Sequence, residues 1–380
     1  MSSRVVIGMS GGVDSSVAAW RLREEGHEVI GVTMKLWPQE CMSRAEDQCC
    51  GPQAIVDARA VAQQVGIPHY VADEQATFQR QVIDYFVAEY RAGRTPNPCI
   101  LCNEKLKFGS LLDMSRSLGA DYIATGHYAI IERGERHRIR KGHDPRKDQS
   151  YFLFSLNQEQ LAQTLFPLGD MTKEQVRAVA ARLGLKVAAK QESQEICFVT
   201  NDNYRPFLRE HGVASHSGDI TDVSGHVLGQ HNGIEFYTIG QRRGLGIATG
   251  RPMYVVALDP TRNRVIVGDD DELGCTECVV NRCNWVSIAS PSGSRSVTVK
   301  IRSQHSGAAA VIESSEDTCD GQVRVRFAQP ERAVTPGQAA VFYDGDLLLG
   351  GGWIMSSSIS YASYSTANVC VYNKPAKVSS

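Results

Sequence analysis

The stretch Gly8–Ser16 reads GMSGGVDSS, and its composition decides how the first part of the chain folds. The apolar run Val5–Met9 leads into it, as in a strand that is buried on both faces, and a helix is expected from about Ser15 to Glu25. Glycines let backbone amides approach an anion, and a helix N-terminus adds unpaired amides and the positive end of a dipole. The sequence therefore predicts a phosphate-binding loop between a strand and a helix; a tight glycine turn is the plainer alternative.

The side chains of this loop indicate which kind of nucleotide reaction it serves. Ser10, Ser15 and Ser16 offer hydroxyl donors, and Asp14 would suit a polyphosphate if Mg²⁺ lay between them. The loop has no lysine, so it is not the GxxxxGK[ST] loop of phosphoryl-transferring NTPases. It resembles the loop of the ATP-pyrophosphatase (PP-loop) family, whose members cleave ATP between the α and β phosphates and transfer AMP to an oxygen. That resemblance implies ATP as a substrate.

The composition of the chain limits the class of protein to which it can belong. The chain has 380 residues, 42% of them hydrophobic and 22% charged, which is typical of a globular protein of two or three domains. No apolar run reaches the ~18–20 residues of a membrane span, and the N-terminal stretch does not read as a signal peptide, so we expect a cytoplasmic protein without a membrane partner. The net charge of −2 gives no sign of nucleic acid. The basic run 138–147 reads most simply as a solvated loop.

The pattern of elements changes twice along the chain. Short strands alternate with helices as far as residue 130, which predicts an α/β fold with a parallel sheet. A helical stretch follows over 157–183, where Thr172 and Gln175 fit a capping box. Glycine-rich turns dominate after about residue 210, and alternating strands from Trp285 predict an antiparallel β-barrel with a hairpin at Asp344–Gly345. We expect an α/β domain at 1–205, the barrel at 273–355 and a disordered tail at 356–380.

Three of the eleven cysteines stand out, Cys99 and Cys102 in TPNPCILCNEKLKFG and Cys197 in SQEICF. Cys102 is expected just before a helix, where a thiol has a lowered pKa and can attack a persulfide or bind a metal. Plainer alternatives are a zinc site shared with Cys49 and Cys50, and a core position for Cys197. The group at Cys275, Cys278 and Cys283 could be a second metal site.

Six strings occur in a fixed order, and together they resemble the bacterial tRNA-specific 2-thiouridylase family over about residues 4–354. They are GMSGGVDSSVAAW, AGRTPNPCILCNEKLKFG, DYIATGHYA, KDQSYFL, GQRRGLGI and TPGQAAVFYDGDLLLGGGWI. The resemblance implies that 1–205 is a catalytic PP-loop domain of the adenine nucleotide alpha hydrolase-like type, that 206–272 is a small central domain, and that a C-terminal barrel follows. It also implies sulfur transfer to C2 of the wobble uridine (position 34) of the tRNAs for Lys, Glu and Gln. A sulfur-relay protein or a cysteine desulfurase would supply the persulfide.

The resemblance also assigns roles to individual residues. Cys102 matches the nucleophile and Cys197 the cysteine that carries the persulfide, and the two would form a disulfide during turnover. The positions that match ATP contacts are Gly8, Met9, Ser10, Gly11, Gly12, Val13, Asp14, Ser15, Met34 and Gly126. The positions that match contacts with tRNA or its target base are Asn97, Pro98, Cys99, His127, Lys147, Asp148, Gln149, Arg302, Ser303 and Gln338.

The chain departs from the family pattern in two places. Cys99 stands where many members have Asp, and Ser193-Gln194-Glu195 stands where they often have Ser-Thr-Gly. With Cys99 present, three cysteines could hold a [4Fe–4S] cluster that delivers sulfide, so persulfide and cluster routes are both open. Two further alternatives are another PP-loop adenylating enzyme, against which the cysteines and the barrel argue, and an RNA-binding protein that has lost catalysis.

Overall fold

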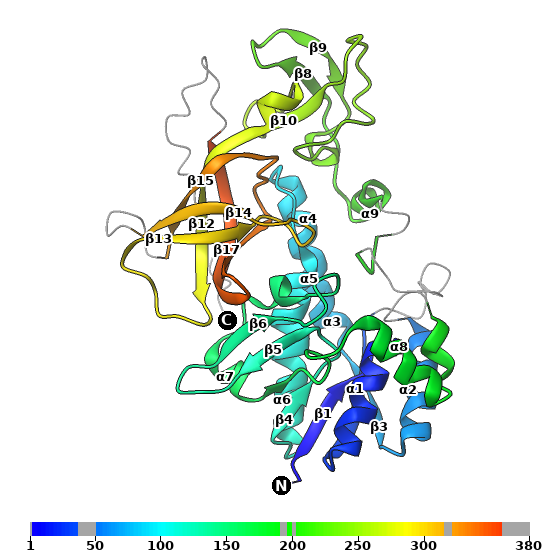
Figure 1. Cartoon of the computed structure of the whole chain (residues 1–380). Coiled ribbons are helices and arrows are strands. Elements are labelled where there is room, and N and C mark those ends of the chain that lie inside the picture. The colour runs from blue at the N-terminus through cyan, green and yellow to red at the C-terminus, as the bar shows by residue number, and fades with distance from the viewer. Residues whose placement is uncertain (1, 37–50, 191–195, 200–202, 315–320, 359–380) are drawn as a thin grey trace, which may run out of the picture.

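Apolar residues, whose side chains point alternately to the two faces, build a five-stranded parallel sheet at the N-terminal end of the molecule (Figure 1). The computed structural model describes residues 2–36, 51–190, 196–199, 203–314 and 321–358. Val5 and Ile7 face one hydrophobic cluster and Val6 faces another, so helices cover both sides of the sheet. The strand order is β3-β2-β1-β4-β7. The strands are β1 (Arg4–Gly8), β2 (Glu28–Lys35), β3 (His69–Asp73), β4 (Tyr122–Ala124) and β7 (Thr164–Leu165).

The helices of this part fall into two groups, one on each face. The first face carries α1 (Val13–Glu24), α2 (Pro52–Val65), α8 (Lys173–Arg182) and the short η5 (Lys186–Ala189). The second carries two long composite helices, α3 (Gln75–Phe78) with η2 (Gln79–Ile83) and α4 (Asp84–Arg91), and α5 (Pro98–Leu101) with η3 (Cys102–Ser110) and α6 (Leu111–Ser117). Both composites contain a π-helical stretch, a distortion frequent at functional sites.

Two local expectations were wrong. The helix expected just after Cys102 starts at Pro98, because proline at the first helical position has its φ preset and lacks only an amide that would be unpaired. The stretch 157–183 is not wholly helical, since β7 separates α7 (Gln158–Ala162) from α8. The capping box at Thr172 and Gln175 is confirmed. Within the described residues, no helix is long and apolar enough to cross a bilayer.

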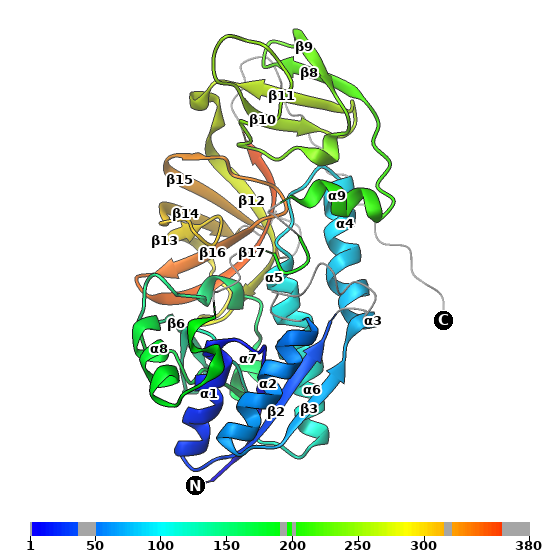
Figure 2. The ribbon, with the colours of Figure 1, turned by 90° about the vertical axis from the view of Figure 1, so that its right-hand side faces the viewer.

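A small mixed sheet forms the middle part at the far end of the molecule (Figure 2). Its order is β10-β11-β8-β9, and α9 (Tyr204–Glu210) connects it to the first part. The strands are β8 (Gly218–Asp222), β9 (Val227–His231), β10 (Tyr254–Asp259) and β11 (Arg264–Gly268), with short turns η7 (Ile234–Phe236) and η8 (Asp270–Leu273).

The expected antiparallel barrel is confirmed. Val297, Val299, Val323 and Val325 point inward, as their alternation with polar residues predicted, and pairing of β12 with β17 closes the barrel. The hairpin predicted at Asp344–Gly345 is present: Asp344 ends one strand, and Gly345 begins the turn to the next. The strands are β12 (Gly274–Trp285), β13 (Gly293–Lys300), β14 (Ala308–Ser314), β15 (Val323–Arg332), β16 (Ala339–Asp344) and β17 (Leu347–Ser358). Of the predicted tail, residues 359–380 lie outside the described residues.

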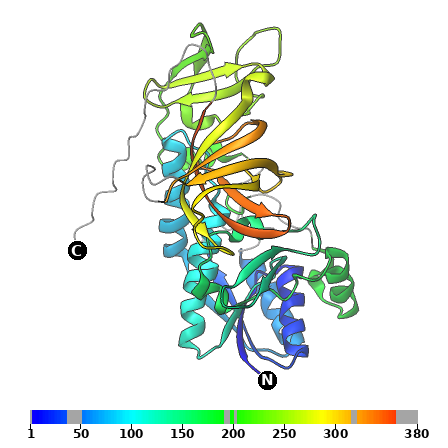
Figure 3. The same cartoon turned by 60° about the vertical axis from the view of Figure 1, so that its left-hand side comes forward.

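A hairpin that the sequence did not predict joins the barrel to the first part. Strands β5 (Ala129–Glu132) and β6 (Arg138–Lys141) follow β4, and β6 pairs with β17 through Ile139 and Leu348 (Figures 1 and 3). Ile139 is fully buried. The start of the basic run is therefore a strand of the barrel sheet and not a solvated loop. A short turn, η4 (Ser150–Leu153), leads back to the first part.

Candidate functional site

The glycine loop joins β1 to α1, as the sequence predicted, and internal hydrogen bonds fix its shape. The Ser10 amide donates to Ser15 Oγ over 3.2 Å, and the hydroxyls of Ser15 and Ser16 donate to the Gly12 carbonyl over 3.2 and 2.8 Å. Gly12 is the N-cap of α1 and no side chain caps it. The first amides of α1 are therefore left to a ligand, which is the arrangement that binds anions.

Two glycines allow other segments to press against this loop. Gly11 has φ +67°, and a Cβ there would lie 2.4 Å from the carbonyl oxygen of Ala54 in the first turn of α2. Gly126 follows β4, and a Cβ there would lie 2.8 Å from the Ser15 amide nitrogen. Met34, at the end of β2, is partly buried against the same core as the cysteines. The predicted ATP positions thus meet at the carboxyl end of three neighbouring strands, where α/β sheets bind ligands.

Asp14 has protein partners on both carboxylate oxygens. Lys173, at the start of α8, places Nζ 2.7 Å from Oδ1 and 2.8 Å from Oδ2, and the Tyr128 hydroxyl donates to Oδ1 over 2.7 Å. Lys173 is only 6% exposed. This ion pair explains how an acid can lie beside a phosphate-binding loop. It does not fit the expectation that Asp14 holds Mg²⁺, because a cation already occupies that position, and no step below depends on the metal.

A second lysine that the sequence analysis missed touches the loop itself. Lys190 donates from Nζ to the Gly11 carbonyl over 3.2 Å and to Asp57 Oδ2, on α2, over 2.7 Å. Lys173 and Lys190 flank the α8–η5 segment, more than 150 residues from the loop in sequence. Nothing in the local pattern around either lysine shows this proximity.

The two cysteines predicted to carry the sulfur chemistry pack on one core cluster. Cys102 and Cys197 are both partly buried against the cluster that contains Phe78 and Phe86. Phe198 fixes the second segment, with its ring centroid 5.9 Å from that of Phe78 and 4.9 Å from that of Phe86. The structure therefore packs the LCN and ICF segments on one core cluster, to which Met34 also contributes.

Cys102 does not lie at a helix N-terminus as expected. It begins η3, one turn inside a helix that starts at Pro98, so the thiol in the first turn is that of Cys99. Cys99, Cys102 and Cys197 all belong to the described residues, and among these no three His, Cys, Asp or Glu side chains gather as metal ligands. The three-cysteine cluster and the Cys275–Cys283 metal site therefore lack support. Cys41, Cys49 and Cys50 lie outside the described residues.

Several positions predicted to touch RNA meet where the barrel contacts α5. The Gln338 amide donates to the carbonyls of Thr95 (2.9 Å) and Pro96 (3.2 Å), which directly precede Asn97 and Pro98. Burial raises the pKa of Tyr151, while hydrogen bonds with the Ala339 carbonyl and with Asn97 and the charge of Arg302 act against this rise. Arg302 is exposed and Ser303, beside it, is partly exposed. Gln338 therefore connects the barrel with the segment just before α5.

The segment Lys147-Asp148-Gln149 is bonded mainly within the protein. Asp148 accepts hydrogen bonds from the amides of Gly142 (3.2 Å) and Ser150 (3.0 Å), and Gln149 exchanges hydrogen bonds with the backbone of Tyr128. Lys147 is partly exposed. The segment therefore connects the barrel, through Ser150, with Tyr128 and hence with Asp14.

His127 is buried and not on the surface. It is 6% exposed, its Nδ1 lies 2.6 Å from Thr125 Oγ1, and its ring lies between Phe108 and Phe166. Burial, with a smaller contribution from the charge of Lys107, holds the pKa of His127 well below its usual value. Its ring is therefore neutral near pH 7.

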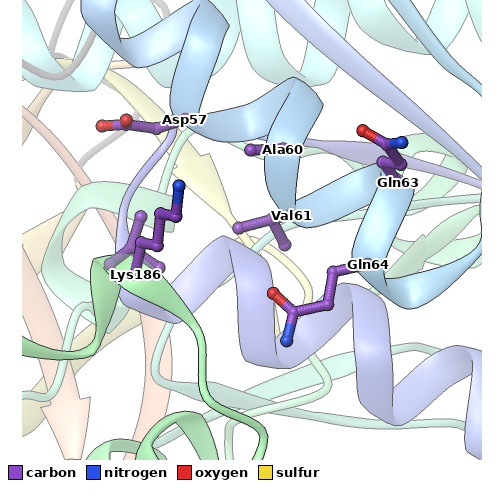
Figure 4. Close-up of a pocket in the computed structure, with 7 residues that line it drawn as sticks. Asp57, Ala60, Val61, Gln63, Gln64 and Lys186 are labelled. Atoms are coloured by element: carbon purple, nitrogen blue, oxygen red, sulfur yellow. The ribbon is translucent and has the colours of Figure 1, made fainter.

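The other candidate groups are structural. Burial raises the pKa of the Cys283 thiol to about 12 and that of Cys278 further. On the barrel face, Arg324 and Arg326 pair with Glu277 and remain largely exposed to solvent. A pocket between α2 and η5 lies behind the loop (Figure 4). Its lining consists of Asp57, Ala60, Val61, Gln63, Gln64, Lys186 and Val187.

Comparison with known families covers almost the whole chain. Residues 3–201 match a model described as a tRNA methyl transferase HUP domain, and residues 205–269 match a tRNA methyl transferase PRC-barrel domain. Residues 275–354 match an aminomethyltransferase beta-barrel domain.

Similar proteins agree over the same length. A tRNA-specific 2-thiouridylase of Geobacter metallireducens is 52% identical over 358 residues, 92% of this chain and 96% of that protein. Those of Moorella thermoacetica and Heliobacterium modesticaldum are 51% and 49% identical; the alignments cover 92% and 93% of this chain and 99% and 93% of those proteins. A solved 4-thiouridine synthetase bound to RNA and ATP overlaps at TM-score 0.34 and 15% identity, covering 55% of this chain and 50% of that one, too distant to carry an argument.

Proposed function

Because the chain belongs to the family of tRNA-specific 2-thiouridylases, we propose that it replaces the C2 oxygen of the wobble uridine of tRNA with sulfur, at the expense of ATP. The observation that carries the proposal is the meeting of two features on one sheet. The loop at the end of β1 has open amides for phosphate, and Cys102 and Cys197 pack on a core beside the same sheet. Activation by AMP and delivery of sulfur need these two features together.

The proposed reaction proceeds in two stages. The loop amides bind the β and γ phosphates, and the C2 oxygen of a uridine turned out of the anticodon attacks the α phosphorus, so that pyrophosphate leaves. The terminal sulfur of a persulfide on Cys197 then attacks C2, and AMP departs with the former oxygen. The Cys102 thiolate attacks Sγ of Cys197, the S–S bond breaks, and its electrons remain on the sulfur now attached to C2. The products are 2-thiouridine and a Cys102–Cys197 disulfide, which a thiol reductant must reduce.

Asn97, Arg302, Ser303 and Gln338 are the proposed tRNA contacts nearest the barrel. The contact between the barrel and the start of α5 supports this, because Gln338 holds the turn that precedes Cys99. The expected substrates are the tRNAs for Lys, Glu and Gln in the cytoplasm, and the expected donor is a sulfur-relay protein or a cysteine desulfurase. His127 and Gln149 would act on RNA indirectly, since their side chains are bonded inside the protein.

Release of AMP and pyrophosphate, measured with and without tRNA, tests the proposal. We expect tRNA-dependent AMP formation and, in the same tRNA, the mass change of an oxygen-to-sulfur exchange. A methyl group, which the domain descriptions mention, would change the mass of uridine by a different amount. AMP formation on a small molecule without tRNA would indicate another adenylating enzyme. Binding of tRNA without AMP formation would indicate an inactive RNA-binding protein.

A further inference from the structure

The phosphate-binding loop has no cation of its own. No Lys or Arg occurs from Gly8 to Trp20, and the next basic residue, Arg21, is bonded to Asp170 and Glu25 at the other end of α1. A helix N-terminus supplies only about half an elementary charge. The triphosphate of ATP, and the pyrophosphate that leaves it, carry several negative charges, so their binding requires a cation that the fold brings to the loop.

Lys190 meets this requirement by position. Its Nζ donates to the carbonyl oxygen of Gly11, in the middle of the loop, over 3.2 Å. The first turn of α2 presses on the same glycine, so the uncapped N-terminus of α2 also lies beside it. The side chain of Lys190 is 28% exposed, so the residue is partly open to solvent. Figures 1 and 2 show α1, α2 and α8 packed side by side at this end of the sheet.

Asp57 holds Lys190 at the edge of the loop. Its Oδ2 lies 2.7 Å from Lys190 Nζ, and Gln53 donates to its other oxygen over 2.8 Å. Burial acts to raise the pKa of Asp57, but the hydrogen bonds from Lys190 and Gln53 outweigh it, so the pKa is lowered and the carboxylate stays charged. The lysine is thus positioned by one carboxylate and one carbonyl, and a phosphate can compete for its remaining hydrogen-bond capacity.

We propose that Lys190 is a ligand of the β and γ phosphates of ATP and of the departing pyrophosphate. It supplies from η5 the charge that other nucleotide-binding loops carry in their own sequence. Lys173 acts in a complementary way. It neutralises the Asp14 carboxylate, which would otherwise repel the same phosphates. This inference rests on the proposed function, since it assumes that ATP binds at the loop.

The competing interpretation is that the ion pair between Lys190 and Asp57 only holds the end of η5 against α2 and takes no part in phosphate binding. The two interpretations differ in what the lysine recognises. A phosphate ligand contributes to binding of ATP and pyrophosphate but not of AMP, which lacks the β and γ phosphates. A purely structural ion pair would affect the binding of all three molecules alike, and replacing either Lys190 or Asp57 would have the same effect.

Calorimetric titration of the full-length Lys190→Gln variant with a non-hydrolysable ATP analogue, pyrophosphate and AMP tests the proposal. We expect about ten- to hundredfold weaker binding of the analogue and pyrophosphate, as for a charge-assisted hydrogen bond, with AMP affinity unchanged. Lys186→Gln is the matched control, because Lys186 is exposed on the same turn, lines the pocket of Figure 4 and makes no hydrogen bond with the loop among the described residues. Asp57→Asn keeps the lysine but removes one of its two positioning partners, and should weaken pyrophosphate binding less than Lys190→Gln does.

Three results would overturn the inference: unchanged pyrophosphate binding in Lys190→Gln, an equal loss for AMP, or an equal loss of pyrophosphate binding in Asp57→Asn. Failure of the wild-type protein to bind the ATP analogue would instead refute the proposed function itself. Thermal unfolding of each variant identifies any that are misfolded; for these, Lys190→Arg, which keeps the charge, should retain pyrophosphate binding.

Discussion

Lys173 Nζ lies 2.7 and 2.8 Å from the two carboxylate oxygens of Asp14, a residue 159 positions earlier in the chain. This pair connects the first turn of α1 with the first turn of α8. Asp144 supports the lysine end, since its Oδ2 accepts the Lys173 amide over 3.0 Å. The loop is therefore held in shape by a contact that does not require ATP.

Removal of Lys173 should destabilise the protein. Lys173→Met leaves Asp14 partly buried without its cation, and we expect a loss of about 2 kcal/mol in the free energy of unfolding, less than for a fully buried pair because Asp14 is 32% exposed. Chemical denaturation of Lys173→Met, Asp14→Asn and the double variant measures the coupling. Additive effects of the two changes would show that the pair contributes nothing.

A methyl group at Gly126 should damage the nucleotide loop. A Cβ there would lie 2.8 Å from the Ser15 amide nitrogen and 2.9 Å from the Asp14 carbonyl carbon, so Gly126→Ala must move the start of α1. We expect at least about tenfold weaker ATP binding, equivalent to ~1.4 kcal/mol. Gly134→Ala is the control, because the nearest atom to its Cβ is 3.6 Å away, and it should bind ATP normally. Wild-type affinity in Gly126→Ala would contradict the geometry.

Burial of His127 makes stability depend on pH. Its pKa is lowered in the folded protein, so in acid the unfolded chain binds a proton that the folded form does not. The stabilisation is complete above pH ~6.5 and is lost as the pH falls below that value, by up to about 1.4 kcal/mol per pH unit. His127→Gln lacks this loss, so the stability gap between wild type and variant should narrow from pH 7.5 to 5.5. A gap independent of pH would show that His127 titrates normally.

Gln338 should contribute to stability as well as to RNA contact. Its amide nitrogen faces two carbonyl oxygens, so Gln338→Glu would replace a donor with an acceptor and repel both. We expect Gln338→Glu to lose more stability than Gln338→Ala, which should cost about 1 kcal/mol. Denaturation of both variants without tRNA measures this difference. A residue that served only to contact tRNA would leave both variants as stable as the wild type.

The sheet and the barrel could be predicted from the sequence because each follows a local period. Val5 and Ile7 alternate with Val6 between two cores, and Val297 and Val299 alternate with polar residues, as expected. The β5–β6 hairpin was missed, because the sequence around Ile139 is mostly basic and its burial depends on β17, about 200 residues later.

The part of the site that lies in one short stretch of sequence could be predicted, and the contacts between distant residues could not. The glycine loop is a single string, and its place between β1 and α1 follows from that string alone. Lys173 and Lys190 were missed because their relation to Asp14 and Gly11 exists only after folding. The position of Cys102 was misjudged because Pro98 begins the helix one turn earlier than expected. The roles of Cys102 and Cys197 stay predictions until they are measured.

A single-turnover reaction tests the central claim most directly. Persulfide-loaded protein, ATP and unmodified tRNA are mixed without reductant, and AMP and 2-thiouridine are quantified by mass spectrometry for wild type, Cys102→Ser and Cys197→Ser. We predict equal amounts of AMP and 2-thiouridine from the wild type, together with a Cys102–Cys197 disulfide, and no 2-thiouridine from either variant. Full formation of 2-thiouridine by Cys102→Ser or Cys197→Ser would contradict the account.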